Sequence, residues 1–245
     1  MLLENKIAVV YGAAGAIGSS VASAFAREGA DLYLASRTGQ KLEKIAGSIV
    51  ELGRRAHVAQ VDVLDRDDME RHAEAIVAAD GRIDVCFNAV SNDDIQGTSL
   101  DEMPVDDVLQ PVIKALRSHF TIATVVGRHM AGAGRGVIIC MAGGREAIPK
   151  LGGSHVAWSA LAGLCRQLAA DLGPHGVRVA WLLSPGSPSD DGQQAGQLDE
   201  PTEGLLPQHQ PLYSEVGQVA AFIASDGART ITAAEINLTG GAVID

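Results

Sequence analysis

The sequence has few cysteines and aromatic residues, and it lacks a long uninterrupted apolar run. Its three cysteines, Cys86, Cys140 and Cys165, lie far apart and form no CxxC pair, which argues against disulfides and a zinc site. Each is most simply a small buried hydrophobic residue in a reducing compartment. No apolar stretch approaches the ~20 residues that a membrane span requires, so an integral membrane protein is not expected.

Basic residues are also scarce. The chain has 19 Lys and Arg against 30 Asp and Glu, which gives a net charge of -11 and a pI near 5.0. This acidic balance argues against nucleic acid or an anionic membrane as the main partner. The N-terminal stretch MLLENKIAVVYG has no basic region ahead of an apolar run, so it does not resemble a signal peptide, and a cytoplasmic location is expected.

What is present fits one α/β domain. A chain of 245 residues with 47% hydrophobic residues can bury one large core, and no domain-sized break or internal repeat divides residues 1–245. One segment, at about 187–212, is rich in Gly, Pro, Gln and acidic residues. It is either a mobile lid over a substrate site or a disordered surface loop.

Short apolar runs alternate with helix-like stretches along the chain. Helices are expected over 18–29 and 39–53, the second with Thr38 as its N-cap. Because the apolar runs are continuous and separated by helices, they predict a doubly wound parallel sheet with helices on both faces. About seven strands are expected, over residues 6–12, 31–36, 55–63, 82–90, 135–143, 177–186 and 233–241.

Three glycines follow the first expected strand, in YGAAGAIGSS. Gly12, Gly15 and Gly18 could simply make a tight strand-to-helix turn, but such a turn also lets backbone N–H groups approach a pyrophosphate at the helix N-terminus. At the end of the second strand, an acid would bind the ribose of NAD, whereas an arginine suits the 2′-phosphate of NADP. That position reads Ser36-Arg37. It predicts a preference for NADP(H) over NAD(H), with a solvated surface arginine as the alternative.

Together these motifs resemble the short-chain dehydrogenase/reductase family, essentially from end to end. YGAAGAIG resembles the family's TGxxxGxG, with Tyr11 in place of Thr and Ala16 in place of the middle glycine. VDV resembles the segment whose aspartate contacts adenine, and IDVCFNAVS resembles the segment written NNAG or NAAG. LAADLGPHGVRVAWLLSPG is the closest match, and IASDGARTITAAEINLTGG resembles the C-terminal strand.

The resemblance implies a Rossmann-type domain that binds a dinucleotide. The cofactor-binding residues that it implies are Gly12, Gly15, Ile17, Gly18, Ser36, Arg37, Asp62, Val63, Asn88, Ala89, Val90, Pro185 and Gly186.

The catalytic positions of the family are replaced. Counting back from LAADLGPHG, the family's YxxxK motif falls on Ser154 to Trp158, so Ser154 stands at the tyrosine position and Trp158 at the lysine position. The family serine falls at Met141 or Ala142, and the assisting asparagine falls near Ala115. In the family, the tyrosine phenol protonates the alkoxide that hydride transfer to a ketone leaves. General acid catalysis of this kind contributes typically ~10²–10⁴-fold, so ordinary ketone reduction is not expected.

Ser154 and His155 are the candidate catalytic residues at the vacated position. A serine hydroxyl is too weak an acid to replace the phenol, although it can donate a hydrogen bond to a carbonyl. His155 has an ordinary pKa near ~6.5, but one residue along a helix turns its side chain about 100° away. Tyr213 either folds over the site or anchors the return of the loop before it. His119 and His129 are interpreted as surface or subunit-interface residues.

Three classes of function fit this sequence. The first is an NADPH-dependent oxidoreductase acting on an activated C=N or C=C, which needs little acid catalysis. The second is a redox-neutral cyclase or isomerase, and the third is a non-catalytic binding or regulatory protein. The first is favoured because the dinucleotide motifs are better preserved than the catalytic ones. Met141, Ala142 and Trp158 make the pocket more apolar, which suits a hydrophobic small molecule.

A homo-oligomer and no metal site are also expected. The helical stretches over 107–130 and 156–173 have more apolar surface than one sheet face can cover, which predicts subunit packing. The resemblance implies a homotetramer or dimer built on these helices. The histidines are spaced without a metal-binding pattern, and no cysteine joins them.

Overall fold

One parallel sheet forms the centre of the computed structural model, which describes residues 1–144, 147–184 and 211–241. Its strands are β1 (Ile7–Tyr11), β2 (Asp31–Ser36), β3 (Ala56–Gln60), β4 (Val85–Asn88), β5 (Gly136–Ala142), β6 (Val177–Leu183) and β7 (Ala234–Asn237). They lie in the order β3-β2-β1-β4-β5-β6-β7, and every neighbouring pair is parallel. The predicted doubly wound Rossmann-type sheet is confirmed.

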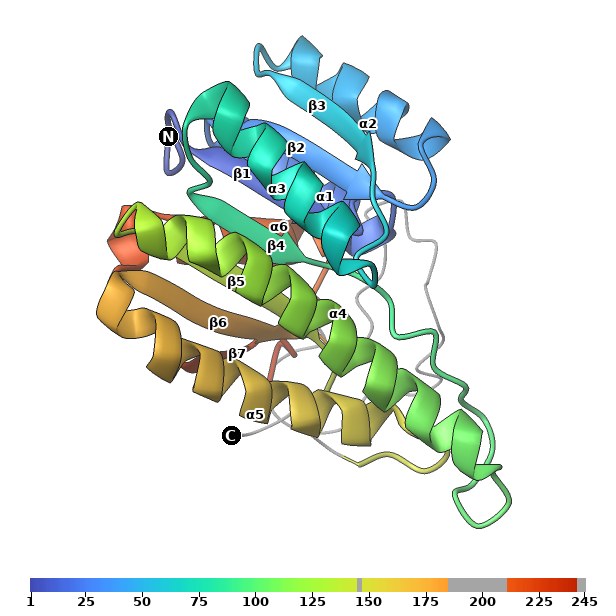
Figure 1. Cartoon of the computed structure of the whole chain (residues 1–245). Coiled ribbons are helices and arrows are strands. Elements are labelled where there is room, and N and C mark those ends of the chain that lie inside the picture. Colours follow the sequence, from blue (N-terminus) through green and yellow to red (C-terminus); the bar gives the residue numbers. More distant parts are fainter. Residues whose placement is uncertain (145–146, 185–210, 242–245) are drawn as a thin grey trace.

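In the part of the chain that the structure describes, six α-helices cover the two faces of the sheet (Figure 1). One face carries α3 (Arg66–Asp80), α4 (Val105–Gly132) and α5 (Ser154–Leu172), and the other carries α1 (Ala16–Arg27), α2 (Gln40–Glu51) and α6 (Tyr213–Ala224). Each layer has its own apolar core against the sheet. Among the helices described, none combines the length and apolar character needed to cross a bilayer.

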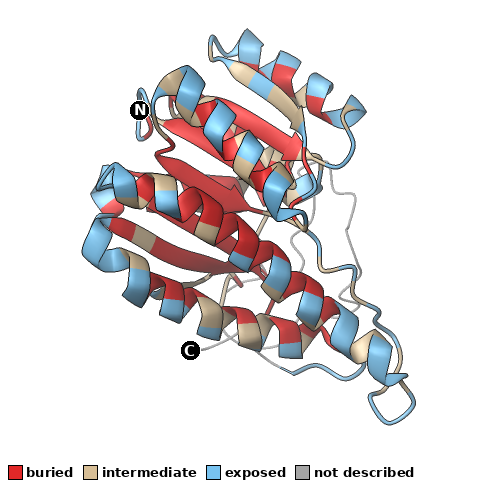
Figure 2. Ribbon diagram, viewed as in Figure 1, coloured by how far each residue is buried: buried red, intermediate tan, exposed pale blue. Residues whose placement is uncertain are grey.

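Burial follows position in the sheet, as Figure 2 shows. Every residue of β1 and β4 is buried, because helices cover both faces of these central strands. The edge strand β3 is only partly buried. All three cysteines are buried free thiols on the face that α3, α4 and α5 cover.

The helix termini differ from the sequence expectation at one cap. α1 begins at Ala16, two residues before the predicted start, and α2 has Gly39 as its N-cap without a side-chain cap, so the prediction of Thr38 as the cap is wrong. The backbone N–H of Thr38 donates instead to Ser36 Oγ at 3.1 Å, and that hydroxyl donates to the Thr38 carbonyl at 2.7 Å. Thr38 therefore belongs to a local turn with Ser36 rather than to the cap of α2.

The topology fixes where a ligand can bind. β2 and β3 lie on one side of β1, whereas β4 and the later strands lie on its other side. Ligands of doubly wound sheets bind at the carboxyl ends of the strands, where the strand order reverses in this way. In Figure 1, α4 extends past this carboxyl edge, and the segment from β4 to α4 runs along it.

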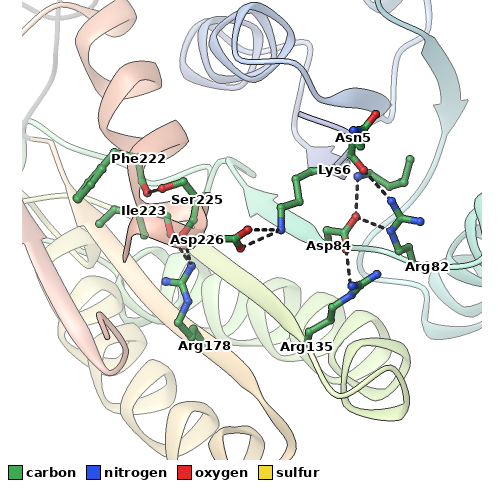
Figure 3. Close-up of polar contacts among 11 residues, drawn as sticks. Asn5, Lys6, Arg82, Asp84, Arg135, Arg178, Phe222, Ile223, Ser225 and Asp226 are labelled. Atoms are coloured by element: carbon green, nitrogen blue, oxygen red, sulfur yellow. Dashed lines mark hydrogen bonds and ion pairs between the residues drawn. The ribbon is translucent and has the colours of Figure 1, made fainter. Parts of the chain in front are cut away.

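The amino edge of the sheet carries a buried polar cluster instead (Figure 3). The Asp84 side chain is only 5% exposed. It accepts hydrogen bonds from the Ile7 backbone N–H and from Arg82 Nε, both at 2.9 Å, and pairs with Arg135 Nε at 3.5 Å. The carboxylate therefore ties β1, the start of β4 and the start of β5 together.

A second cluster beside it binds the end of α6. The Arg178 guanidinium donates to the carbonyls of Ile223 at 2.8 Å and Ser225 at 3.2 Å, and Lys6 pairs with Asp226 at 2.9 Å (Figure 3). Asp226 is 87% exposed at its side chain, so water screens this ion pair. The two clusters differ in burial and should differ in their contribution to stability.

Replacing Asp84 with Ala should lower the free energy of unfolding by about 3 kcal/mol, because the change leaves a buried N–H and two guanidinium groups without their anion. The matched change Asp226→Ala removes an exposed pair and should cost less than about 1 kcal/mol. Urea-induced unfolding of both variants measures the difference. Equal losses of unfolding free energy in the two variants would contradict the expectation that the buried carboxylate contributes more to stability than the exposed one.

Candidate functional site

A cleft of about 530 Å³ opens at the carboxyl edge of β1, β2, β3 and β4. It lies at the point where the strand order reverses, as the topology requires for a doubly wound sheet. Its lining residues are Gly12, Ala14, Gly15, Ser36, Arg37, Thr38, Lys41, Val61, Asp62, Val63, Leu64, Ala89, Val90, Ser91 and Lys114.

The turn between β1 and α1 forms the floor of the cleft. Gly12 has φ +78°, and a Cβ there would lie 2.6 Å from the Ala89 carbonyl oxygen. A Cβ at Gly18 would overlap the Gly12 carbonyl, so both positions need glycine for close approach. Gly15 caps α1 without a side-chain hydrogen bond, which leaves the first N–H groups of the helix available to an anion.

The end of β2 brings cations to the cleft. Ser36 closes the turn to Thr38, whereas Arg37 is exposed and forms no hydrogen bond or ion pair with any described residue. Lys41, on the first turn of α2, lines the same side. Together these side chains form a positive wall beside the glycine turn, in a chain whose net charge is -11.

The end of β3 supplies the residues predicted to contact adenine. Asp62 is exposed, and its carboxylate accepts a hydrogen bond from the Leu64 N–H at 3.0 Å, while its own N–H donates to Asp68 Oδ2 at 2.7 Å. Val63 is buried behind it and also lines the cleft. Asp62 is the one acidic side chain among the described residues that line the cleft.

The end of β4 places the other predicted cofactor residues. Asn88 is 1% exposed, and its Oδ1 accepts a hydrogen bond from the Val90 N–H at 3.0 Å, while its Nδ2 has no partner among the described residues. Ala89 and Val90 line the cleft directly. Ile17 does not line it, because its side chain packs against the core beneath α1. The predicted residues Pro185 and Gly186 lie outside the described residues, as does most of the predicted lid.

Lys114, on α4, also lines the cleft, and sequence reasoning missed it. Its side chain is 10% exposed and pairs with Asp93, from the segment between β4 and α4. One feature of the sequence could have indicated it: a lysine lies on the face of this helix that is otherwise buried. Pro111, Ala115 and Ser118 on the same face are all buried.

Ser154, the first candidate catalytic residue, is fully buried at the first turn of α5. Its hydroxyl donates a hydrogen bond to the Asp94 carboxylate and accepts one from Gln96 Nε2 at 3.3 Å. Gln96 Nε2 also donates to Asp94 Oδ2 at 2.6 Å. The segment after β4 thus covers Ser154, and sequence reasoning did not find the Asp94 and Gln96 contacts.

His155 and Trp158 follow on the same helix. His155 is partly buried, and its Nδ1 has no partner among the described residues. The indole of Trp158 lies against Gly143 at the end of β5, in the space that a side chain at 143 would fill. Trp158 also borders a second cavity of about 210 Å³, whose other lining residues are Gly144, Ser159, Ala162, Arg166, Leu183 and Glu235.

None of the three tyrosines, all in the described part of the chain, lines either cavity. Tyr11 is completely buried, with its hydroxyl 3.1 Å from His72 Nδ1, and Tyr33 donates to Asp80 at 2.7 Å. Burial raises the pKa of Tyr11, raises that of Tyr33 to about 12 and raises that of Tyr213. No tyrosine is therefore prepared as a proton donor near neutral pH.

The positions predicted to hold the family's serine and asparagine are apolar and enclosed. Ala115 and Ala142 are buried, and Met141 packs against the opposite core. His119 lies one turn along α4 from Ala115. It is 1% exposed, so its interpretation as a surface or interface residue is wrong. Burial lowers the pKa of His119 to about 4, so it is neutral near pH 7.

The cleft can therefore bind an anionic ligand, but it presents no phenol. Three cations, Arg37, Lys41 and Lys114, surround a helix N-terminus without a side-chain cap. Within the described residues, no three His, Cys, Asp or Glu side chains gather in a way that would hold a metal ion. The arrangement fits phosphate recognition by charge and backbone N–H groups.

Comparison with known proteins agrees with this geometry. A family model described as enoyl-(acyl carrier protein) reductase matches residues 12–243. D-threitol dehydrogenase of Mycolicibacterium smegmatis is 31% identical, over 99% of this chain and 94% of that protein. NAD-dependent glycerol dehydrogenase of Listeria innocua is 27% identical, over 99% of this chain and 95% of that protein.

Solved structures share the fold over almost the whole chain. Carveol dehydrogenase from Mycobacterium avium, in complex with NAD, has a TM-score of 0.87 at 24% identity and covers 98% of both chains. A blue fluorescent protein from a metagenomic library, in complex with NADPH, has a TM-score of 0.84 at 23% identity and covers 100% of both. With a family model that spans nearly all of its length and a relative 31% identical from end to end, this chain belongs to the short-chain dehydrogenase/reductase family.

Proposed function

We propose that this protein is an NADP(H)-binding oxidoreductase that works without the family's tyrosine and lysine and reduces an activated C=N or C=C in a hydrophobic small molecule. The proposal rests on a contrast between two parts of the carboxyl edge, the nucleotide cleft and the start of α5. The nucleotide cleft has its glycine turn and three cations, whereas α5, from Ser154 to Leu172, contains neither tyrosine nor lysine.

The described residues fit a dinucleotide. Backbone groups of Gly12 and Gly15 would hold the pyrophosphate at the N-terminus of α1, and Arg37 would hold the 2′-phosphate. Asp62 would contact the adenine. The remaining residues proposed to bind the cofactor are Gly18, Ser36, Val63, Asn88, Ala89, Val90, Pro185 and Gly186. Ile17 is proposed to bind through its backbone alone, because its side chain packs against the core. When bound, the nicotinamide supplies a hydride. NAD and NADPH each occur in a structural neighbour, so the proposed NADP preference rests on Arg37.

The substrate class follows from what the site lacks. A hydride added to an iminium carbon gives a neutral amine, so no proton donor is needed at the reacting atoms. A hydride added to an activated C=C leaves a delocalised anion, which water can protonate after the transfer. The alkoxide formed from a ketone is more basic and needs an acid in the transition state. Ser154 and His155 are the proposed catalytic residues, in the limited role of hydrogen-bond donors that orient a substrate. For Ser154 this role requires the segment with Asp94 and Gln96 to move away from its hydroxyl. Trp158 borders the second cavity, whereas Met141 and Ala142 line neither cavity and supply no polar side chain there. This favours an apolar substrate over a sugar or polyol.

A redox-neutral or non-catalytic role is the second candidate, and one observation favours it. Among the described residues, the cleft is lined from the ends of β1, β2, β3 and β4 and from α2 and α4, but not from β5, β6 or α5. Such a cleft would bind a nucleotide without placing a substrate beside it. A fluorescence titration with NADPH, followed by a screen for NADPH oxidation, separates the classes: binding without any turnover would favour the second candidate.

The proposed assembly is a homotetramer or dimer. α4 exposes Leu109 at 45%, Ile113 at 54% and Phe120 at 49%, and α5 exposes Val156 at 45%. Figure 2 shows that α4 and α5 alternate buried and exposed residues along their length. Large exposed apolar side chains gathered on neighbouring helices are typical of subunit contacts.

Replacing Arg37 with Ala should erase most of the cofactor preference. The wild type should bind NADPH about tenfold more tightly than NADH, because the guanidinium pairs with the 2′-phosphate. Calorimetric titration with both cofactors measures the ratio. Arg27→Ala removes the same charge at the far end of α1 and should keep the preference. Equal NADPH and NADH affinities in the wild type would contradict the proposed preference for NADPH.

Restoring the family's pair in Ser154→Tyr with Trp158→Lys should not give a ketone reductase. Ser154 is fully buried under Asp94 and Gln96, so a phenol displaces that segment, and Ala142 still offers the substrate no hydroxyl. The new lysine enters a space shaped for an indole, where desolvation disfavours its charge. We expect only trace NADPH oxidation with activated ketones. Robust ketone reduction by the wild type itself would overturn the proposed substrate class.

The change Phe120→Asp should dissociate the oligomer, because a carboxylate in an apolar subunit contact is costly to bury. Light scattering at micromolar concentration should give a multiple of the chain mass for the wild type and a smaller mass for the variant. Val50→Asp, at a 58% exposed position on α2, is the matched control and should keep the wild-type mass. A monomeric wild type would contradict the proposed assembly.

A further inference from the structure

The segment between β4 and α4 brings a carboxylate to Lys114, one of the cations that line the cleft. Asp93 lies in this segment, and its Oδ2 accepts a charged hydrogen bond from Lys114 Nζ on α4. The Lys114 side chain is 10% exposed, whereas that of Asp93 is 48% exposed. The pair therefore joins a cation inside the cleft wall to an anion that water can reach.

Lys114 occupies a particular place in the wall. It lines the proposed nucleotide cleft and also a groove formed by α4 and Leu64, which includes Ile113 and Arg117. Among the described residues, no other lysine or arginine is buried. A buried ammonium group needs an anionic or strongly polar partner, because an unpaired charge in a low dielectric is costly. In the ligand-free chain, Asp93 is that partner.

The backbone presents Asp93 to the lysine. Asp93 has φ +54°, in the left-handed region that aspartate and asparagine adopt more readily than other residues with a Cβ. Its N–H donates to Ser91 Oγ at 3.1 Å, which closes the turn directly after the cleft-lining residues. The hydrogen bond from Lys114 holds the pKa of Asp93 below its ordinary value, and the charge of Arg37 acts in the same direction.

We propose that Lys114 is a phosphate-binding residue of the nucleotide cleft and that Asp93 is an internal anion that a phosphate of the dinucleotide displaces from it. The chemistry is an exchange of partners: the ammonium group keeps an anion throughout, first the carboxylate and then the phosphate. Asp93 can leave because it is half exposed, whereas Lys114 stays in the wall. This inference rests on the nucleotide site of the proposed function, and it assigns the site a second basic residue besides Arg37.

Binding measurements on four proteins test the exchange: the wild type, Asp93→Asn, Lys114→Gln and the double variant. Asparagine tolerates φ +54°, so Asp93→Asn keeps the turn and removes only the charge. The ligands are NADPH, adenosine 2′,5′-bisphosphate and inorganic pyrophosphate, titrated by calorimetry. The charge controls are Asp101→Asn, an exposed acid of the same segment, and Lys44→Gln, an exposed lysine of α2.

The exchange predicts opposite effects. Asp93→Asn should bind NADPH about fivefold more tightly, because no internal anion competes. Lys114→Gln should bind it about tenfold more weakly. The double variant should bind NADPH with the same affinity as Lys114→Gln, because Asp93 competes with the phosphate only for Lys114. Both control changes should leave the affinity within about twofold of the wild type.

Several outcomes would overturn the inference. If Asp93→Asn binds NADPH no more tightly than the wild type, or if its effect persists without Lys114, the carboxylate does not compete for that lysine. Lys114→Arg retains the cation and should bind NADPH nearly as well as the wild type, so an equal loss in both Lys114 variants would indicate a structural role. Binding with these effects but without turnover would overturn the proposed oxidoreductase and support this inference. Failure of every protein to bind any of the three ligands would overturn both.

Discussion

The turn after β1 lies against the backbone of the strands on both sides of it. The Gly12 N–H donates to the Ala35 carbonyl at 2.9 Å, and the Ala89 N–H donates to the Tyr11 carbonyl at 2.9 Å. Because the Ala89 carbonyl fills the space where a Cβ at Gly12 would lie, the turn can approach only as a bare backbone. The start of α1, the end of β2 and the end of β4 are thereby fixed around one anion-binding point, and the cleft is the space between them.

The cleft gathers positive side chains although the whole chain carries a negative net charge. A chain with a net charge of -11 places Arg37, Lys41 and Lys114 around this point, and Asp93, which does not line the cleft, pairs with Lys114. The next residue, Asp94, accepts a hydrogen bond from Ser154 at the start of α5. Two consecutive aspartates of one segment thus contact Lys114 on α4 and Ser154 on α5. The pairing of Lys114 and the enclosure of Ser154 depend on the same short stretch of chain.

The strands, their parallel pairing and the location of the cleft could be predicted because continuous apolar runs and a glycine turn are local patterns with few structural solutions. Asp62, Ala89 and Val90 line the cleft as the family motifs imply. The predictions failed where distant segments meet. Nothing in the order of residues showed that Asp93 would fold back onto Lys114, that Ser154 would be covered, or that His119 would be buried. Thr38 was a plausible cap by type, but its backbone pairs with Ser36 in a turn and the helix begins one residue later, with Gly39 as the N-cap.

The three cysteines give the fold a built-in reporter. Cys86 on β4, Cys140 on β5 and Cys165 on α5 are buried in the same layer, between the sheet and the helices α3, α4 and α5. Burial raises the pKa of Cys86, so its reactive thiolate is scarce as well as shielded. An alkylating reagent can modify these thiols only when that layer separates from the sheet. The rate of labelling under native conditions therefore measures the opening of one face of the molecule, independently of the other.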